Sequence, residues 1–549
     1  MRLDRRSFAA GAVSALGTGW ISPALAQNTP YAAALEAIRA YGEANLRHFA
    51  LPGLTLALTA PDGFRTVLNF GRANLETPAP ITGDTLFQIG SISKLINAAI
   101  LHQYAAEGRL TLSSRVSDLL PSLPLPVGNR ITVQDLLNHL AGLPADAPMD
   151  PAGGLWTAYS PGEHWSYSNT GYEILGRLIE RVAGKPLAVV NRERIFDPLA
   201  MTHSRGAIES ADRNLYAQGY RVADEGTFVP GVPLAPAPWV DLTFAAGNVA
   251  STGADMIPLL RSLADAAQGR GGLGLPTAAA TAFTRHAVAS DSPSMRYGNG
   301  LMHVDNGGRK YLHHTGGMLS FASSFHVDVG SGVGAFASTN LTGLAGYRPR
   351  LLTQFAVDAL TSASTGGALP APPSLYVRST HAPAYLGRFA GPSGAFEIRS
   401  GNPLTIVADG KAAPLQPVGG ELFRTTHPSF RAFDLMFERS RNVVVSAAFG
   451  SKSYVRAGSD HSLPASDRML AKLAGRFVSP DPWFGTVIIV ERGGRLWMGT
   501  ETPLIRMAGN LFRVGDESWS PERALFDSFI EGRPQALVFS GARFARAGI

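Results

Sequence analysis

The stretch FQIGSISKLINAAI, from Phe87 to Ile100, places a serine and a lysine three residues apart where an apolar run begins. Ser91 and Lys94 would share one face of a helix that starts here. A hydroxyl becomes a good nucleophile when a base takes its proton, and a buried lysine can be that base near neutral pH. Taken alone, however, the pair favours a serine helix cap followed by a lysine whose stem lies along apolar surface.

A second polar turn is predicted in PGEHWSYSNTGYEILGRLIERVAG, residues 161–184. The apolar residues after Asn169 recur on one helical face, and Gly184 is a typical helix stop. The Tyr167 phenol could carry a proton to a leaving group, and Asn169 could bind Lys94 or a substrate amide. The alternative is a Tyr167 that packs in the core and an Asn169 that caps the helix.

The third segment is YLHHTGGMLSFASSFHVDVGSGVGAFASTN, residues 311–340. It contains the pair His313–His314 and predicts a strand that ends at His314–Thr315–Gly316–Gly317, followed by a β-hairpin. Glycines at a strand edge let a substrate carbonyl approach backbone N–H groups, as an oxyanion hole requires. The alternative for the two histidines is metal binding or packing, but no third ligand or H-E-x-x-H pattern accompanies them.

In this order, S-x-x-K, Y-x-N about 75 residues later and H-x-G about 145 residues beyond resemble the serine hydrolases of the class C β-lactamase and penicillin-recognising family. Three further stretches resemble the same family: ITVQDLLNHLAGLP at 131–144, IFDPLAMTHS at 195–204 and AAGNVASTGADM at 245–256. The resemblance covers roughly residues 35–360. It implies an α/β sandwich, in which helices flank an antiparallel sheet, with an additional helical subdomain.

The resemblance also implies a role for each motif residue. The implied catalytic residues are Ser91 as nucleophile, with Lys94 and Tyr167 as the proton-handling pair. The implied substrate-binding residues are Asn169, His314, Gly316 and Gly317, and the N–H groups of Ser91 and Gly317 would form the oxyanion hole. The implied reaction is acyl transfer through an ester on Ser91 followed by hydrolysis, with no metal and no cofactor.

The remaining chain is predicted to form separate β domains. A hydrolase domain over 27–362 is followed by a linker at 363–380 that continues the Gly/Ala/Pro-rich stretch from 361. Two motifs recur in similar form: YLGRF (385–389) resembles LAGRF (473–477), and YVRAG (454–458) resembles FARAG (544–548). This weak repeat predicts two antiparallel β-barrels, at 381–458 and 473–549 with a linker at 459–472, and the alternative is one larger barrel. They resemble the lipocalin-like domains of D-aminopeptidase-type members, where such domains can shape the pocket.

The first 26 residues, MRLDRRSFAAGAVSALGTGWISPALA, are typical of an export signal. Arg5–Arg6 favour twin-arginine export over ordinary secretion, and a retained N-terminal helix is the third interpretation. A periplasmic or secreted protein is therefore expected. The chain has no cysteine, which excludes disulfides and thiol nucleophiles.

The composition argues against two kinds of partner, nucleic acid and a membrane. Charged residues make up 16% of the chain and the formal charge of +6 is scattered, so no nucleic-acid role is expected. Beyond the leader no run of 18 apolar residues predicts a membrane span.

The substrate is predicted to be a small molecule or short peptide. His314, in place of the usual lysine, weakens the charge that would hold a substrate carboxylate. We therefore expect a peptidase or amidase of small or non-ribosomal peptides, including D-residue-containing or linearised cyclic ones. A carboxylesterase is the first alternative and a β-lactamase or DD-carboxypeptidase the second. A non-catalytic ligand-binding sensor is the alternative of another class, and the oligomeric state stays open.

Overall fold

The computed structural model describes residues 30–123, 125, 130–151, 154–223, 229–342, 349–375 and 382–548. The predicted export signal lies outside these residues, as does part of the predicted linker at 363–380. Among the described helices, none combines the length and apolar character that a membrane crossing requires.

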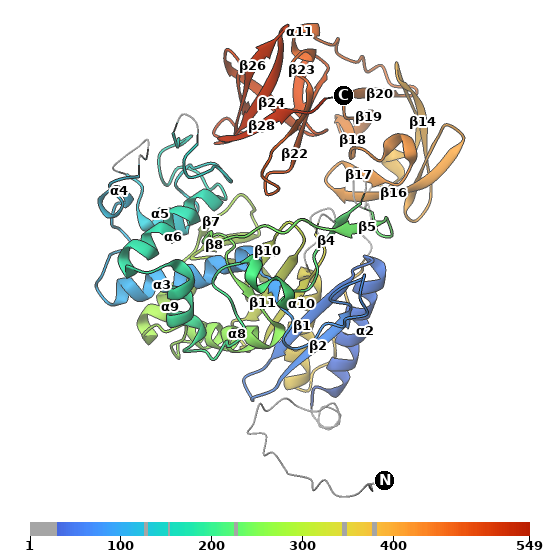
Figure 1. Ribbon diagram of the computed structural model, residues 1–549. Helices are drawn as coiled ribbons and strands as arrows, with labels where there is room; N and C mark the ends of the chain where they lie inside the picture. The colour runs from blue at the N-terminus through green and yellow to red at the C-terminus, as the bar shows by residue number, and fades with distance from the viewer. Residues whose placement is uncertain are drawn as a thin grey trace, which may run out of the picture.

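An eight-stranded antiparallel sheet forms the centre of the first part of the chain (Figure 1). In spatial order its strands are β2 (Arg65–Gly71), β1 (Gly53–Thr59), β12 (Gly334–Thr339), β11 (Ala322–Asp328), β10 (Arg309–Gly317), β9 (Leu301–Asn306), β8 (Met295–Gly298) and β7 (Val288–Ala289). The predicted strand that ends at Gly317 is thus β10, and the predicted hairpin is β11 and β12. Two small ladders accompany the sheet: β3 (Phe87–Gln88) with β6 (Ala250–Ser251), and β4 (Tyr220–Val222) with β5 (Leu234–Pro236).

Helices cover both faces of this sheet. Helices α2 (Ala32–His48) and α10 (Arg350–Ser364) pack on one face, where Leu54, Leu56 and Leu58 of β1 point. Helix α8 (Gly253–Ala267) packs on the other face, where β12 presents Phe336. Successive strand residues point to opposite faces, so a strand covered on both sides is buried throughout, as all seven residues of β1 are.

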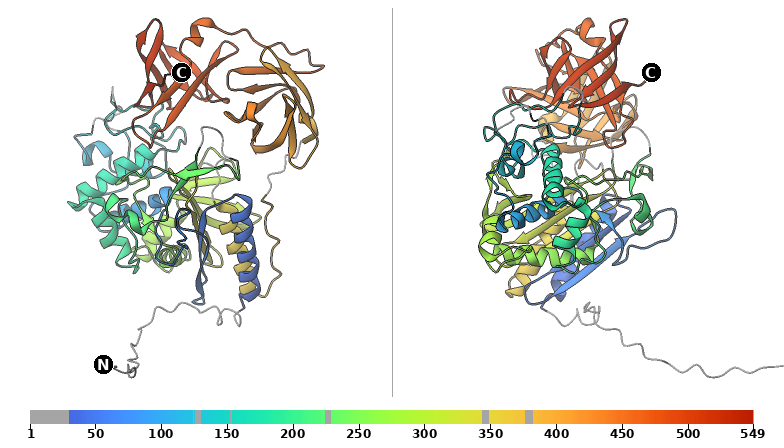
Figure 2. Two further views of the ribbon diagram at one scale, coloured as in Figure 1. Left: turned by 45° about the vertical axis from the view of Figure 1, so that its right-hand side comes forward. Right: turned by 60° about the vertical axis from the view of Figure 1, so that its left-hand side comes forward.

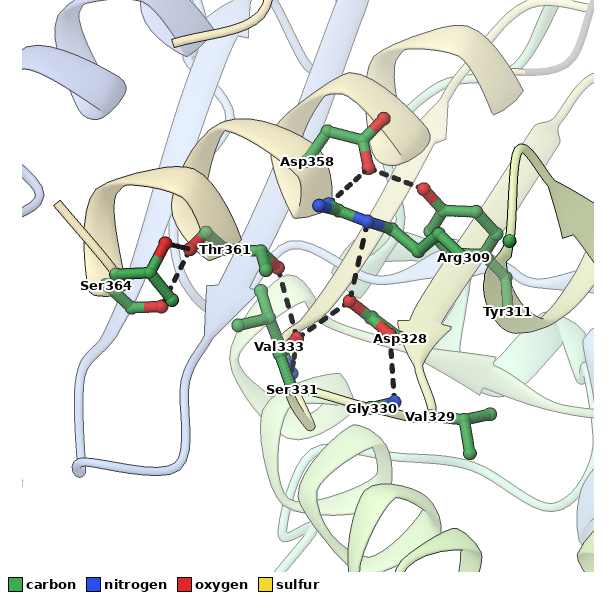
Figure 3. Close-up of polar contacts among 12 residues, drawn as sticks. Arg309, Tyr311, Asp328, Val329, Gly330, Ser331, Val333, Asp358, Thr361 and Ser364 are labelled. Carbon is green, nitrogen blue, oxygen red and sulfur yellow. Dashed lines mark hydrogen bonds and ion pairs between the residues drawn. The ribbon is translucent and has the colours of Figure 1, made fainter. Parts of the chain in front are cut away.

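A polar network fastens α10 to the sheet (Figure 3). Asp358 of α10 accepts hydrogen bonds from Arg309, at 2.8 Å, and from the Tyr311 hydroxyl, both on β10. Asp328, at the end of β11, lies 3.9 Å from the Arg309 guanidinium and accepts a hydrogen bond from Ser331 at 2.9 Å. The network thus joins one helix to two neighbouring strands.

The remaining helices of the α/β part lie together on one side of it, where α3, α4, α5, α6 and α9 are labelled (Figure 1). They are α3 (Ser93–Ala106), α4 (Val116–Leu119), α5 (Val133–Leu137), α6 (Asn169–Ala183), α7 (Leu187–Asn191) and α9 (Thr277–Arg285). Helix α6 ends at Gly184 with a φ of 68°, the left-handed conformation expected of a glycine stop. Its N-cap is Ser168, whose hydroxyl accepts the Gly171 N–H, so capping by Asn169 was the wrong interpretation.

Two closed eight-stranded barrels follow, and Figure 2 shows both at one end of the α/β part. The first contains β13 (Gly387–Gly391), β14 (Gly394–Arg399), β15 (Leu404–Ala408), β16 (Lys411–Gly419), β17 (Leu422–Thr425), β18 (Leu435–Ser440), β19 (Val443–Phe449) and β20 (Lys452–Arg456). The short helix α11 (Arg468–Ala471) precedes the second, which contains β21 (Gly475–Val478), β22 (Thr486–Arg492), β23 (Arg495–Met498), β24 (Thr502–Ala508), β25 (Leu511–Val514), β26 (Arg523–Ile530), β27 (Arg533–Phe539) and β28 (Ala542–Arg546). Closure leaves no unpaired strand edge, which explains how short strands persist without a covering helix.

The weak sequence repeat marks equivalent positions where each barrel closes. Phe389 pairs with Arg456 in the first barrel, and Phe477 pairs with Arg546 in the second. Both phenylalanines are fully buried in the barrel cores. The predicted fold class, an α/β sandwich followed by two antiparallel barrels, is confirmed, and the single larger barrel is wrong. The exact domain boundaries stay predictions.

Candidate active site

Ser91 and Lys94 lie where a one-turn 3₁₀ helix, Gly90–Ile92, runs into α3. The Lys94 Nζ atom is 3.0 Å from the Ser91 Oγ atom. The spacing of three residues produces this contact, because the two side chains project from one side of a continuous helical path. Ser91 is half-buried, whereas Lys94 is fully buried.

Two further acceptors hold the Lys94 amine. Its Nζ atom donates to Asn169 Oδ1 at 2.6 Å and to the Ala246 carbonyl at 3.0 Å. It also lies 4.9 Å from the centre of the Tyr167 ring. Thus Tyr167 and Asn169, far from Lys94 in sequence, meet it in the structure.

Burial lowers the pKa of Lys94 from 10.5 to about 7. Removing the ammonium from water disfavours its charged form, and the carboxylates of Asp146 and Glu173 oppose that shift only in part. Near neutral pH a large fraction of Lys94 is therefore the free amine. A free amine 3.0 Å from a hydroxyl oxygen can accept its proton.

Sequence reasoning did not identify these two carboxylates. Asp146 Oδ1 accepts a hydrogen bond from Asn169 Nδ2 at 2.8 Å, and Glu173 accepts the Ala246 N–H at 3.2 Å. Asp146 therefore holds the Asn169 side chain, and Glu173 holds Ala246; both of these residues accept a hydrogen bond from Lys94. Burial raises the pKa of Glu173 to about 7. The only sequence feature that could have identified either carboxylate was the position of Glu173, one helical turn after Asn169.

His314 is fully buried beside this group and is uncharged. Its Nδ1 lies 2.6 Å from the Thr315 carbonyl, which can only accept, so the proton resides on Nδ1. Its Nε2 therefore accepts from the Tyr297 hydroxyl at 3.2 Å. Burial, together with the nearby Lys94 charge, lowers the pKa of His314 to about 3. His314 thus supplies no fixed charge, and its predicted contact with substrate stays a prediction.

His139 is a further buried histidine that sequence reasoning left without a role. Its Nδ1 accepts the Ser168 N–H at 3.1 Å, so its Nε2 carries the proton. Its ring centre lies 4.3 Å from that of Tyr167 and 4.6 Å from that of Tyr297. His139 therefore packs against the rings of Tyr167 and Tyr297.

Gly316 of β10 and Gly90 beside Ser91 allow close contact between the end of β10 and the segment that carries Ser91. A Cβ atom on Gly316 would lie 1.9 Å from the Ile89 carbonyl oxygen, and one on Gly90 would lie 2.8 Å from the Gly317 nitrogen. Side chains at these positions would separate the two backbones. The approach brings Gly317 to the same cavity as Ser91, which is where the predicted oxyanion hole requires it.

A cavity of about 260 Å³ opens beside Ser91. Much of its wall is apolar, with contributions from Met149, Leu242, Phe244, Met318, Trp483 and Phe484. The charged side chains that line it are Asp146, Glu173, Arg177 and Asp481. Asp481, Trp483 and Phe484 belong to the β21–β22 loop, so the second barrel forms part of the cavity wall. Within the described part of the chain, no three His, Asp or Glu side chains group as a metal site would require.

Comparisons with known proteins identify chains that are similar to this one. The family model described as Beta-lactamase matches residues 38–357. Penicillin-binding protein 4 of Amycolatopsis lactamdurans is 31% identical over 315 residues, which are 53% of this chain and 81% of that protein. Alignments with curated beta-lactamases span 46 to 50% of those enzymes.

Two solved structures are similar over most or all of their own length. The D-amino acid amidase of Ochrobactrum anthropi SV3, complexed with L-phenylalanine amide, is 27% identical with a TM-score of 0.51, covering 61% of this chain and 99% of that chain. The octameric penicillin-binding protein homologue of Pyrococcus abyssi is 20% identical with a TM-score of 0.54, covering 77% of this chain and all of that chain. The second likeness is one of fold.

Proposed function

This chain belongs to the beta-lactamase family of serine hydrolases, and from that premise we propose that it is an amidase or peptidase of short, amine-bearing substrates. The Lys94–Ser91 contact of 3.0 Å and the lowered pKa of Lys94 support acyl transfer at Ser91. The charge of the adjoining cavity supports the choice of substrate.

The proposed reaction proceeds through an ester on Ser91. The Ser91 oxygen attacks the amide carbon while its proton passes to the free amine of Lys94. The N–H groups of Ser91 and Gly317 would receive the charge on the carbonyl oxygen. Tyr167 would carry the proton to the departing nitrogen as the C–N bond breaks. Water then cleaves the ester, which releases the acid and restores the Ser91 hydroxyl.

The observation that favours an amine-bearing substrate is the acidic character of the cavity. Asp146 and Asp481 line it together with Glu173, which is partly ionised near neutral pH because its pKa is about 7, against the single guanidinium of Arg177. A β-lactam or a peptide C-terminus presents a carboxylate, which such a wall repels, whereas an ammonium group is attracted. The apolar part of the wall suits an uncharged side chain. The 27% identity to a D-amino acid amidase points in the same direction.

Aminoacyl p-nitroanilides test this proposal. We expect kcat/KM for D- or L-phenylalanine p-nitroanilide to exceed that for its N-acetylated counterpart by about tenfold or more, equal to about 1.4 kcal/mol. The acetylated compound is a matched control, because it keeps the ring and the scissile bond but lacks the ammonium group. Equal values for the two compounds would contradict the predicted recognition.

A carboxylesterase is the second candidate, favoured by the apolar share of the cavity wall. It predicts turnover of short p-nitrophenyl esters and none of the anilides. Hydrolysis of a chromogenic cephalosporin in place of either would favour a β-lactamase. Covalent labelling of Ser91 without turnover of any of these compounds would favour a sensor.

We also propose that Arg5–Arg6 direct export of the folded protein. The paired arginines and the absence of cysteine support this proposal. Residues 1–30 fused to a fluorescent protein that folds in the cytoplasm should send it to the periplasm of a bacterial host, and replacing both arginines with lysine should stop that. Unchanged periplasmic fluorescence after the replacement would contradict the twin-arginine route.

A further inference from the structure

The second barrel docks on the loop that leads to Tyr167. The Trp156 indole donates to the Pro521 carbonyl at 2.8 Å. The His164 ring stacks on Trp519, with ring centres 4.7 Å apart and planes within 8°. Arg523 lies over the Trp156 ring at 4.9 Å. On the loop, these contacts all lie at residues 156–164.

One contact between the second barrel and this part of the chain differs from the others. It reaches Ala145, the neighbour of Asp146. The Glu522 carboxylate accepts the Ala145 N–H at 2.7 Å through one oxygen. Its other oxygen accepts the hydroxyl of Ser540, which holds the carboxylate from within the barrel. The Glu522 side chain is half-buried, and burial raises its pKa, while these two hydrogen bonds oppose that effect. Its two oxygens thus join the barrel to the backbone of Ala145.

Ala145 is one step from the residues that hold the lysine. Its carbonyl accepts the Asn169 N–H at 2.7 Å and the Thr170 N–H at 3.2 Å. The next residue, Asp146, accepts a hydrogen bond from the Asn169 side chain at 2.8 Å. Asn169 in turn accepts from Lys94 at 2.6 Å. Ala145, whose N–H Glu522 binds, therefore contacts Asn169 through its own carbonyl and through the side chain of its neighbour Asp146.

We propose that Glu522 of the second barrel is a positioning residue for Lys94, acting through Ala145, Asp146 and Asn169. The acceptor at Glu522 sets the position of the 145–146 backbone, and this sets the position of Asn169. The second barrel thereby helps to position the base, Lys94, and it also forms part of the cavity wall. The inference rests on the proposed acyl transfer at Ser91.

The Glu522 side chain offers a clear set of variants in the full-length protein. Glu522→Ala removes the acceptor. Glu522→Gln keeps an acceptor for the Ala145 N–H and removes the charge, and its NH2 group can donate to the Ser540 hydroxyl oxygen in place of accepting from it. Arg523→Ala is the matched control, because it weakens the same docking surface at Trp156 without touching Ala145. Glu522→Met has similar volume and no acceptor, and it replaces the alanine variant if that one does not fold.

The measured quantity is the rate at which a fluorophosphonate labels Ser91, together with kcat and KM. We expect Glu522→Ala, or Glu522→Met, to slow labelling and lower kcat by about tenfold, because small misplacement of a catalytic group costs about that much or more. KM should change less than kcat. Glu522→Gln and Arg523→Ala should stay within about twofold of the wild type. This pattern, with melting temperatures that show folded variants, supports the proposal.

Two results would overturn the proposal. One is a Glu522→Ala or Glu522→Met protein that is labelled as fast as Arg523→Ala, which would leave Glu522 with a docking role only. The other is a Glu522→Gln protein as slow as the alanine variant, which would assign the effect to the charge or to the Ser540 contact and not to the acceptor for Ala145. Wild-type protein that is not labelled at Ser91 would instead refute the proposed function itself, so the two failures are distinguishable.

Discussion

Lys94 should set the pH at which Ser91 becomes reactive. Only the free amine can take the hydroxyl proton, and burial lowers the pKa of Lys94 to about 7. With that pKa, about one-tenth of the enzyme carries the free amine at pH 6 and about nine-tenths at pH 8. We therefore expect kcat/KM and the rate of Ser91 labelling to rise about tenfold between pH 6 and pH 8. An exposed lysine would place this rise near pH 10.

Substituting the two carboxylates near Lys94 tests which group causes this rise with pH. Asp146 and Glu173 both raise the pKa of Lys94, so Asp146→Asn and Glu173→Gln should each move the rise to lower pH. The second variant is also a control, because Glu173 has a pKa of about 7 and could itself cause a rise in this range. In Glu173→Gln any rise that persists cannot come from residue 173.

Labelling with a fluorophosphonate between pH 5 and pH 9, with mass spectrometry of the Ser91 peptide, measures these rates. Lys94→Arg is the control for charge without a base, since a guanidinium stays protonated over this range. It should lower the rate by about 10²–10⁴ and abolish the rise. A flat wild-type profile, or a rise near pH 7 that neither carboxylate variant moves, would refute the assignment of Lys94 as base.

Three further outcomes follow from the site. Ser91→Ala should abolish labelling and leave the melting temperature within about 2 °C of the wild type, since it removes one half-buried oxygen; labelling that persists would reveal another nucleophile. Gly316→Ala should destabilise the protein by about 1–3 kcal/mol in denaturant unfolding, because its Cβ would meet the Ile89 carbonyl at 1.9 Å; unchanged stability would contradict that contact. Trp483→Ala should lower kcat/KM about tenfold for substrates with large apolar side chains and leave Ser91 labelling by a small fluorophosphonate unchanged, because it removes apolar wall from the cavity; equal loss for small and large substrates would argue against a role in specificity.

Local patterns predicted much of the fold. The helices α3 and α6, the stop at Gly184 and the strand β10 with the hairpin after it all follow from hydrophobic spacing and glycine, which act over a few residues. The repeat in the tail predicted two barrels because equivalent closing strands need equivalent residues. The Ser91–Lys94 contact is local in the same sense, since it depends on one helical turn.

The parts of the site that sequence reasoning missed depend on contacts between distant segments. Asp146 lies in a loop without a periodic pattern, and its importance comes from Asn169, 23 residues away. Asp481 and Trp483 reach the cavity from another domain. No spacing rule connects such residues, because loop conformation and domain docking set their positions.

The sequence by itself determined which chemical groups are available: a serine and lysine on one helical turn, a tyrosine and asparagine at the start of another helix, and glycines at the end of a strand. Only the tertiary structure decided how those groups are arranged and which of them is protonated. Lys94 is a candidate base because the folded chain surrounds it completely, and an ammonium group that loses its water loses its proton more easily. The charge of the cavity was likewise decided by packing, since three distant segments contribute its carboxylates.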